Sequence, residues 1–445
     1  TTVANNLSTN AVVFNNLGNG TTGQVIGNGG AANTVASTFD YADAATSATV
    51  ELKDGIDNGA LSITGGKLTS ITLKSSGAKN DIDALTLESD VTSFTIDASS
   101  SLQTSGALDL GKTSTLTIKG SAAVDLDAAT LDGDTDTVDG SASTGDIDIS
   151  TGVVGVNTAA TGATITNVTD LTVTTGSGND KVTFASTADR QVDIKTGAGN
   201  DEGVVQRVLT EATSTAVGDV LDGGDGTDIL TLTTTLVNGH GAVTGVTNFE
   251  ELTISDTNAN DIILKNLQAT GFNTVNAKSG VGDSSDITFT TGSVGVLNLQ
   301  DLTTGSTGHT VQMGGSGTTD EVQIVNEDAA ANVFAGKNIT ATGIETLTID
   351  TTGTGDATAQ TIGTIGGTAS TGATLTVKFT GSNKMTTGVI TANHVDASAM
   401  TGVFSTTTSR LVGKTGGTNS IKGGSGNDVI IGDTDDTTNI DGNGG

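Results

Sequence analysis

Four short glycine-rich turns, each ending in aspartate, constrain the fold of this chain more than any other feature. Their sequences are Thr-Gly-Ser-Gly-Asn-Asp, Thr-Gly-Ala-Gly-Asn-Asp, Gly-Gly-Asp-Gly-Thr-Asp and Gly-Gly-Ser-Gly-Asn-Asp, at residues 175–180, 196–201, 223–228 and 423–428. Three of them run directly into aliphatic segments that predict strands, at residues 181–183, 229–231 and 429–431. A short turn followed at once by a strand, and used repeatedly, indicates a chain built from stacked coils.

The residue types in these turns point to calcium. Glycine allows the backbone to bend tightly enough to aim several carbonyl oxygens at one point, and aspartate adds an anionic oxygen. Hard oxygen ligands in a flexible loop are what calcium prefers. The predicted fold class is therefore all-β, a parallel β-helix or β-roll solenoid with calcium-binding glycine–aspartate turns.

The rest of the chain agrees with stacked strands. Its 445 residues include 63 Gly and no Pro, and proline is excluded from interior strands because it cannot donate to a hydrogen-bond ladder. Apolar and polar residues alternate in segments such as Ile71-Thr72-Leu73 and Leu116-Thr117-Ile118, which predicts strands with one face in the core. The best helical candidate is short, at residues 202–213.

The net charge of −32 excludes nucleic-acid binding, because no basic patch exists to meet phosphate. Such acidity is also typical of disordered chains, but these lack the regular alternation seen here. Divalent cations would neutralise part of the charge.

The chain has no cysteine, and we expect no apolar run that spans a membrane. We expect a secreted protein on the extracellular cell surface, and a fragment of a longer one, since residues 440–445 resemble the opening of another turn.

Four regions are expected along the chain: a β-solenoid with degenerate repeats (1–165), a calcium-binding region (166–232), further solenoid repeats (233–410) and a C-terminal β-roll (411–445). A longer repeat connects them. It is an octet in which a turn and an acidic residue precede a strand of the pattern Leu-Thr-aliphatic. The octet occurs at residues 166–173, 247–254 and 342–349. Glycine-rich acidic turns precede the second and third octets, so the repeat predicts coils that bury each other's apolar faces.

The full calcium nonapeptide is Gly-Gly-x-Gly-x-Asp-x-aliphatic-x. Residues 223–231 and 423–431 match it fully, Thr175 and Thr196 replace the first glycine, and Gly203 replaces the aliphatic residue, which weakens the strand prediction there. The candidate calcium-binding residues are Gly176, Gly178, Asn179, Asp180, Gly197, Gly199, Asn200, Asp201, Asp222, Gly223, Gly224, Asp225, Gly226, Asp228, Gly423, Gly424, Gly426, Asn427, Asp428, Asp433, Asp435 and Asp436.

A calcium ion in such a fold is shared between turns on neighbouring coils. The first two turns begin at Thr175 and Thr196, a spacing that is close to two coils and predicts one shared site. The acidic run at 423–436 predicts another. Looser acidic turns, at residues 132–136, 283–286 and 314–320, are weaker candidates whose alternative is a solvated loop.

Few residues suggest catalysis. The three histidines, His240, His309 and His394, are far apart in the sequence, and we expect them on the surface. No zinc, nucleophile or phosphate-loop motif is present. Acidic residues in the repeated octet are expected to be structural rather than a carboxylate pair for glycoside hydrolysis. Thr-x-Thr strands, such as residues 231–233, suggest an ice-binding face, but their irregular spacing argues against it. The chain is therefore expected not to be an enzyme.

These residues resemble the RTX-type surface-layer proteins of Gram-negative bacteria. The resemblance rests on residues 221–230, which contain the complete turn, and on residues 248–254 and 344–349, which contain the strand that follows it. It implies a secreted, non-enzymatic β-solenoid that binds many Ca²⁺ ions and self-assembles into a two-dimensional lattice. It also implies type I secretion, and anchoring to cell-surface polysaccharide through a region outside this sequence.

Two alternatives remain open at this point. One is an RTX adhesin or biofilm-matrix protein, for which near-identical tandem modules would be the signature, whereas these repeats diverge. The other is the calcium-binding module of a secreted enzyme whose catalytic domain lies outside this sequence.

Overall fold

The computed structural model describes the whole chain except residues 29–34, 132–134, 152–170, 185–190, 210–217, 240–244, 257–271, 279–285, 291–293, 301–307, 315–316, 329–331, 335, 353–358, 371, 407–418, 433–437 and 444–445. It divides into two compact units. Unit one comprises Thr1–Leu230 and Thr244–Phe249, and unit two comprises Thr231–Val243 and Glu250–Gly445. The four regions expected from the sequence remain a prediction.

Unit one contains three parallel sheets. Sheet 1 consists of β1 (Thr2–Asn6), β3 (Thr22–Ile26), β5 (Ser47–Lys53), β8 (Ser70–Ser76), β11 (Ser93–Ala98), β14 (Thr115–Gly120), β16 (Thr137–Ser143), β18 (Leu171–Thr174), β20 (Val192–Lys195), β22 (Val220–Asp222) and β24 (Val246–Thr247). Sheet 2 consists of β2 (Val12–Leu17), β4 (Ser37–Tyr41), β7 (Leu61–Thr64), β10 (Leu85–Leu87) and β13 (Leu108–Asp109). Sheet 3 consists of β6 (Asp57–Asn58), β9 (Asn80–Ile82), β12 (Leu102–Thr104), β15 (Val124–Leu131), β17 (Ile147–Thr151), β19 (Lys181–Phe184) and β21 (Glu202–Val205), followed by β23 (Ile229–Leu232).

Unit two repeats the same plan and adds one short helix, α1 (Thr234–Gly239). Sheet 4 consists of β25 (Glu251–Ile254), β26 (Thr274–Ala277), β28 (Val294–Leu299), β30 (Glu321–Asn326), β32 (Thr346–Asp350), β35 (Thr376–Gly381), β37 (His394–Met400), β39 (Asn419–Lys422) and β40 (Thr438–Asp441). Sheet 5 consists of β27 (Asp286–Thr290), β29 (Gly308–Gly314), β31 (Asn338–Thr342) and β34 (Ile365–Thr368). Sheet 6 consists of β33 (Gln360–Ile362), β36 (Met385–Thr387) and β38 (Phe404–Thr406).

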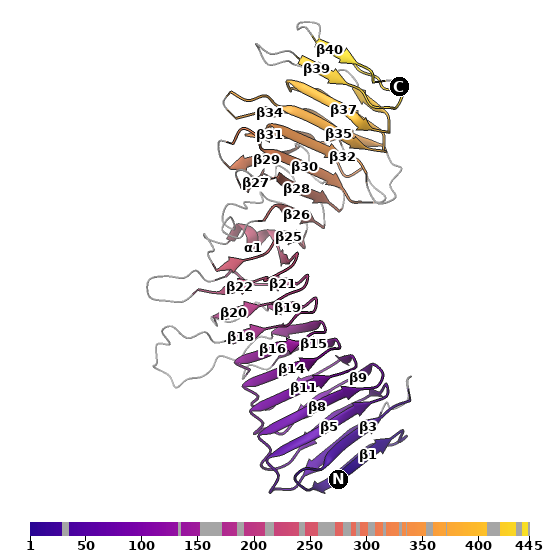
Figure 1. The fold of residues 1–445 in the computed structure, drawn as a ribbon, viewed down its shortest axis with the longest axis vertical. Helices are drawn as coiled ribbons and strands as arrows, with labels where there is room; N and C mark the ends of the chain where they lie inside the picture. The colour runs from indigo at the N-terminus through magenta and orange to yellow at the C-terminus, as the bar shows by residue number, and fades with distance from the viewer. Residues whose placement is uncertain are drawn as a thin grey trace. The chain divides into compact units, whose positions relative to one another are not determined.

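The chain winds as a parallel β-solenoid, as predicted. Strands from successive coils lie side by side, which Figure 1 shows for β5, β8, β11 and β14. Ser70 pairs with Ser93 and Ser93 with Thr115, so each of these intervals is one coil. The helix expected at residues 202–213 is wrong at its start, because β21 pairs in register with β19. Pairing with a neighbouring coil overrides the weak helical pattern.

The core is formed by the inward residues of each alternating strand. Ile71, Phe94, Leu116 and Val138 are in register on four successive coils of sheet 1, and none is more than 1% exposed. Complete burial of such a side chain contributes roughly 1.5–3 kcal/mol, so the ladder as a whole is a major source of stability.

Buried polar residues fix the corners between sheets, and Asn80 is the clearest case. Its side chain is fully buried, and its Oδ1 accepts hydrogen bonds from the backbone N–H groups of Gly55 (3.2 Å) and Ile56 (3.1 Å). Its Nδ2 donates to Ser75 Oγ (2.8 Å) and to the carbonyl oxygen of Leu52 (3.2 Å). Asn80, the first residue of β9, therefore joins two successive coils at the corner just before β6 begins.

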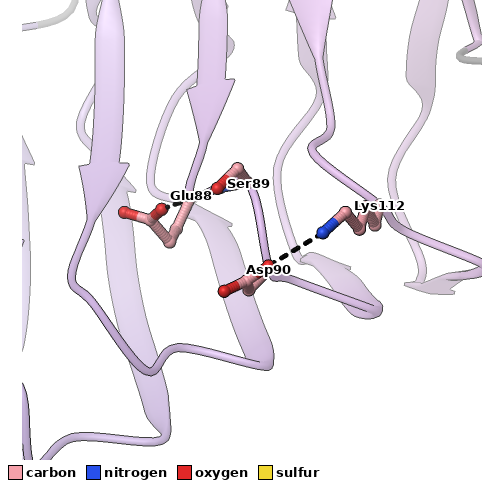
Figure 2. Close-up of polar contacts among 4 residues, drawn as sticks. All are labelled: Glu88, Ser89, Asp90 and Lys112. Atoms are coloured by element: carbon pink, nitrogen blue, oxygen red, sulfur yellow. Dashed lines mark hydrogen bonds and ion pairs between the residues drawn. The ribbon is translucent and has the colours of Figure 1, made fainter.

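Other corners lie in solvent. Figure 2 shows Glu88, whose Oε1 accepts from the Ser89 backbone N–H (3.0 Å), and Asp90, whose Oδ1 lies 2.9 Å from Lys112 Nζ on the next coil. Glu88 Oε2 also accepts from the backbone N–H of Gly65, and this bond lowers the pKa of Glu88. The Lys112 and Asp90 side chains are 64% and 62% exposed, so their ion pair contributes little to stability.

The octet repeat corresponds to a specific corner. Asn248 and Gly343 occupy the same octet position and adopt left-handed backbone conformations, with φ of 54° and 67°. The residues that follow them, Phe249 and Ile344, are almost fully buried. Asparagine and glycine are the residues that tolerate this conformation best, so the repeated sequence encodes a left-handed bend into the core.

Candidate metal site at the glycine–aspartate turns

The first three turns stack directly on one another in unit one. Lys181, which follows the first turn, pairs with Glu202, which follows the second, so Asp180 and Asp201 are separated by one coil. The prediction that this spacing is close to two coils is therefore wrong, because coils of this solenoid are longer than those of a simple β-roll. The turns still meet as neighbours, as a shared site requires.

The aspartates that end these turns form a buried column. Asp180, Asp201 and Asp228 are each at most 1% exposed. The backbone N–H of Asp180 donates to Asp201 Oδ1 (2.7 Å), and that of Asp201 donates to Asp228 Oδ1 (2.8 Å). The column ends at Ile147, whose N–H donates to Asp180 Oδ1 (2.7 Å). Each of three adjacent coils thus places one carboxylate next to that of its neighbour, an arrangement that the sequence motif requires but does not itself establish.

The column is electrostatically strained when all its carboxylates are charged. The pKa of Asp201 is raised to about 7, mainly by burial and also by the neighbouring carboxylates of Asp180 and Asp228, against opposing hydrogen bonds. Burial also raises the pKa of Asp180. Asp201 Oδ2 is buried and has no hydrogen-bond partner. A buried carboxylate oxygen without a partner needs either a proton or a cation.

These shifts predict an unusual pH dependence for the metal-free protein. Asp201 and Asp148, whose pKa burial raises to about 6, both bind protons more tightly when folded than in the unfolded chain, where a carboxyl titrates near pH 4. Their contribution to stability is complete below that pH and is lost as the pH rises through about 6 and 7. We expect unfolding free energy to fall by on the order of 2 kcal/mol between pH 5 and pH 8. Asp201→Asn should flatten the profile measured by thermal unfolding with chelator present; an unchanged slope would contradict the assignment.

A second column of side chains contains two of the predicted residues, Asn179 and Asn200, and one residue that was not predicted, Asp146. Asp146 Oδ1 accepts from the Asn179 backbone N–H, Asn179 Oδ1 from that of Asn200, and Asn200 Oδ1 from that of Thr227, at 2.8 to 3.0 Å. Asp146 belongs to the coil below the first turn. The signal was present, because the Gly-Asp pair before an alternating strand at residues 145–149 resembles the Gly-Asn pairs of the first two turns.

Glycine is required in these turns by close backbone approach. Gly199 and Gly226 lie one above the other with φ of 133° and 155°. A Cβ on Gly199 would lie 1.9 Å from the Gly178 carbonyl oxygen, and a Cβ on Gly226 would lie 1.6 Å from that of Gly199. Neither position accepts a side chain without moving the backbone, so the glycines allow the turns to pack.

The threonines that interrupt the nonapeptide have a role of their own. Thr175 Oγ1 donates to the Thr196 carbonyl oxygen (2.6 Å), and Thr196 Oγ1 donates to that of Gly223 (2.7 Å). Both threonines are buried. The two threonines therefore connect each turn to the next. In doing so, their hydroxyl groups donate hydrogen bonds to the backbone carbonyl oxygens at the start of the second and third turns.

Gly203 does not prevent its strand from forming, because β21 is present. A Cβ at Gly203 would meet Phe249 Cζ at 3.4 Å and Leu230 Cδ1 at 3.5 Å, which is ordinary contact. Apolar side chains from later coils therefore border the space that the missing aliphatic residue would use.

The fourth turn, in unit two, has the same local geometry. Asp428 Oδ2 accepts from the Gly424 backbone N–H (2.6 Å), as Asp180 Oδ2 accepts from that of Gly176 (3.1 Å). Asp428 Oδ1 accepts from the Phe404 N–H (2.8 Å). The strand predicted at residues 429–431 is wrong, since only a single bridge from Val429 to Ser405 forms. Asp433, Asp435 and Asp436 lie outside the described residues.

The remaining acidic candidates are less complete. Asp222 accepts from Asn248 Nδ2 (2.7 Å), and the Asp225 side chain is exposed on the third turn. Asp320 is buried, and its backbone N–H donates to Glu345 Oε2 (2.8 Å). The candidate turns at 132–136 and 283–286 lie largely outside the described residues.

One expectation about the histidines is wrong. His309, on β29, is half-buried with both ring nitrogens covered, and it lines a small pocket with Lys337 and apolar side chains, including Phe334. It occupies the position that Ile339 takes on the next coil. His394 is half-buried, and its Nδ1 lies 2.9 Å from Ser420 Oγ. His240 lies outside the described residues.

The donor chemistry of the turn stack fits calcium. Its unpartnered buried atom, Asp201 Oδ2, is a hard anionic oxygen. Within the described part of the chain, no three Asp, Glu, His or Cys side chains converge as a metal-binding group. An ion at these turns would therefore depend on backbone carbonyl oxygens together with one or two carboxylates.

Comparison with known proteins adds no assignment. No protein-family model, curated protein or solved structure matches this chain. In the ranges that the structure describes, no helix has the length and apolar character needed to cross a membrane.

Proposed function

We propose that this protein is a structural, non-enzymatic surface-layer protein, secreted to a Gram-negative cell surface, where it binds calcium and self-assembles into a two-dimensional lattice. The observation that carries the proposal is the buried column of Asp180, Asp201 and Asp228 on three adjacent coils. The resemblance to RTX-type surface-layer proteins extends it from calcium binding to lattice formation.

Calcium has a physical reason to bind this column. Buried, stacked carboxylates destabilise the fold unless they are neutralised, and the pKa of Asp201, raised mainly by burial and also by its neighbours, reflects that cost. One or two of the carboxylates of Asp180, Asp201 and Asp228, together with backbone carbonyl oxygens of the glycine turns, would hold the ion. When bound, it supplies the positive charge that the column lacks, and because it binds only the folded state it stabilises that state.

Calcium would also act between protein molecules. With a net charge of −32, two copies of the chain repel each other at neutral pH. Divalent cations at acidic faces reduce this repulsion and allow the copies to associate. A parallel solenoid suits such a lattice because its sheets present long, regular outer faces.

The proposal is tested by electron microscopy of purified protein in millimolar calcium and in excess chelator. Ordered sheets are expected with calcium only, because the acidic faces repel without it. Asp201→Asn should weaken assembly, whereas Asp90→Asn removes the same charge from an exposed position and should not. Sheets that form equally well in chelator would overturn calcium-dependent assembly.

A further inference from the structure

An ion pair with a ring contact lies between the second and third turns of unit one. Arg207 Nη2 lies 2.9 Å from Asp219 Oδ1 and 3.0 Å from Asp219 Oδ2. The Arg207 side chain is 10% exposed and that of Asp219 is fully buried. The guanidinium carbon also lies 4.8 Å from the centroid of the Phe184 ring. The other ion pairs formed by described residues have much more exposed partners.

The pair ties together the ends of a long connection. The connection from β19, which ends at Phe184, to β20, which begins at Val192, is short. On the next coil, the connection from β21 to β22 runs from Val205 to Val220 and is about twice as long. The coil from Asp201 to Asp228 is longer than the coil from Asp180 to Asp201 for this reason. Arg207 and Asp219 lie near the two ends of the longer connection, so their contact draws its ends together.

The same cluster contacts all three coils that carry a turn. Phe184 ends the strand that follows the first turn. Val192 begins the strand that leads into the second turn, and its backbone N–H donates to Asp219 Oδ1 (3.1 Å). Asp219 comes directly before β22, which leads into the third turn. Arg207, Asp219 and Phe184 thus form a clip across the stack, which we call the Arg207 clip.

We infer that Arg207 is a positioning residue that holds the third turn in register on the second. The register consists of the Asp201 N–H bond to Asp228 Oδ1 (2.8 Å) and the Gly199 N–H bond to the Asp225 carbonyl oxygen (2.9 Å). Without the clip, Asp219, which leads into the third turn, loses its tie to Arg207 at the other end of this connection, and the third turn is held less firmly on the second. The link to calcium affinity rests on the proposed function; the register itself does not.

The register is tested without metal, by amide hydrogen exchange of the full chain in chelator. In Arg207→Met, the amides of Gly199, Asp201 and Asp225 should exchange at least about tenfold faster than in the unmodified protein, which corresponds to about 1.4 kcal/mol of local stability. The amide of Thr95, far along sheet 1, should be unchanged. Lys112→Met breaks an exposed ion pair and serves as the matched control. Uniform acceleration of all protected amides, or none, would overturn the inference.

A calcium titration followed by calorimetry tests the consequence. Arg207→Met should bind calcium about tenfold more weakly at a temperature where circular dichroism shows it folded. Arg207→Lys should recover part of the affinity, because it keeps the charge but not the planar fork. Equal affinity of Arg207→Met and the unmodified protein would refute the role in metal binding. If the unmodified protein binds no calcium, the proposed function fails, while the exchange experiment still decides the role of the clip.

Discussion

Replacing Gly226 with alanine is expected to destabilise unit one by about 3–5 kcal/mol. The added Cβ would lie 1.6 Å from the Gly199 carbonyl oxygen, at a backbone φ of 155° that alanine rarely adopts. Both atoms in this clash are backbone or directly attached to it, so no side-chain rotation relieves it. The third turn must then move away from the second, and the Asp201–Asp228 contact is lost. Chemical denaturation followed by circular dichroism measures the effect.

Gly203→Ala is the matched control. Its Cβ would meet Phe249 and Leu230 at ordinary contact distances, and its backbone is not left-handed. We expect a change within about 1 kcal/mol, since alanine fills space without displacing backbone. Equal destabilisation by the two substitutions would mean that close packing of the turns is not the cause.

Asn80→Ala is expected to cost a similar amount, about 3–5 kcal/mol, in another part of unit one. It removes the acceptor of the buried N–H groups of Gly55 and Ile56, and it removes the amide donor to Ser75 Oγ and to the Leu52 carbonyl oxygen. Each unsatisfied buried group costs about 1–3 kcal/mol, although some will recruit water. Thermal unfolding at fixed pH measures the loss.

Asn10→Ala provides the comparison for Asn80, because Asn10 is exposed and its amide makes only a local bond to Thr9. It should change the melting temperature by about a degree or less. A small effect of Asn80→Ala would show that the corners are held by strand pairing rather than by buried polar groups.

The solenoid was predictable because it depends on a property repeated in every coil. Alternation around Ile71, Phe94 and Leu116 identifies strands without any long-range information. The lengths of the coils were not predictable, because the connections between strands differ in length, as the one from Val205 to Val220 shows. Asn80 fixes one corner through a hydrogen-bond set that nothing in the sequence marks, whereas Asn248 fixes another through a left-handed conformation and belongs to the repeated octet.

The candidate site was predictable to a similar extent. The motif located the turns and their aspartates. The spacing of Asp180 and Asp201, however, fits one long coil as well as two short ones. Only the pairing of Lys181 with Glu202 shows that it is one long coil. The Arg207 clip could not be foreseen, because Arg207 and Asp219 lie at opposite ends of a long connection and share no motif. Asp146 had a recognisable signal in the Gly-Asp pair that precedes its strand.

The most direct test of calcium binding at the turn stack is the melting temperature of the full chain at pH 7.5, in saturating calcium and in chelator. At a calcium concentration of about 100 times the dissociation constant, one site adds about 2.7 kcal/mol to the stability. We therefore expect the melting temperature of the unmodified protein to rise by about 5–10 °C, and that of Asp201→Asn to rise less. Identical melting temperatures of the unmodified protein in calcium and in chelator would contradict the account.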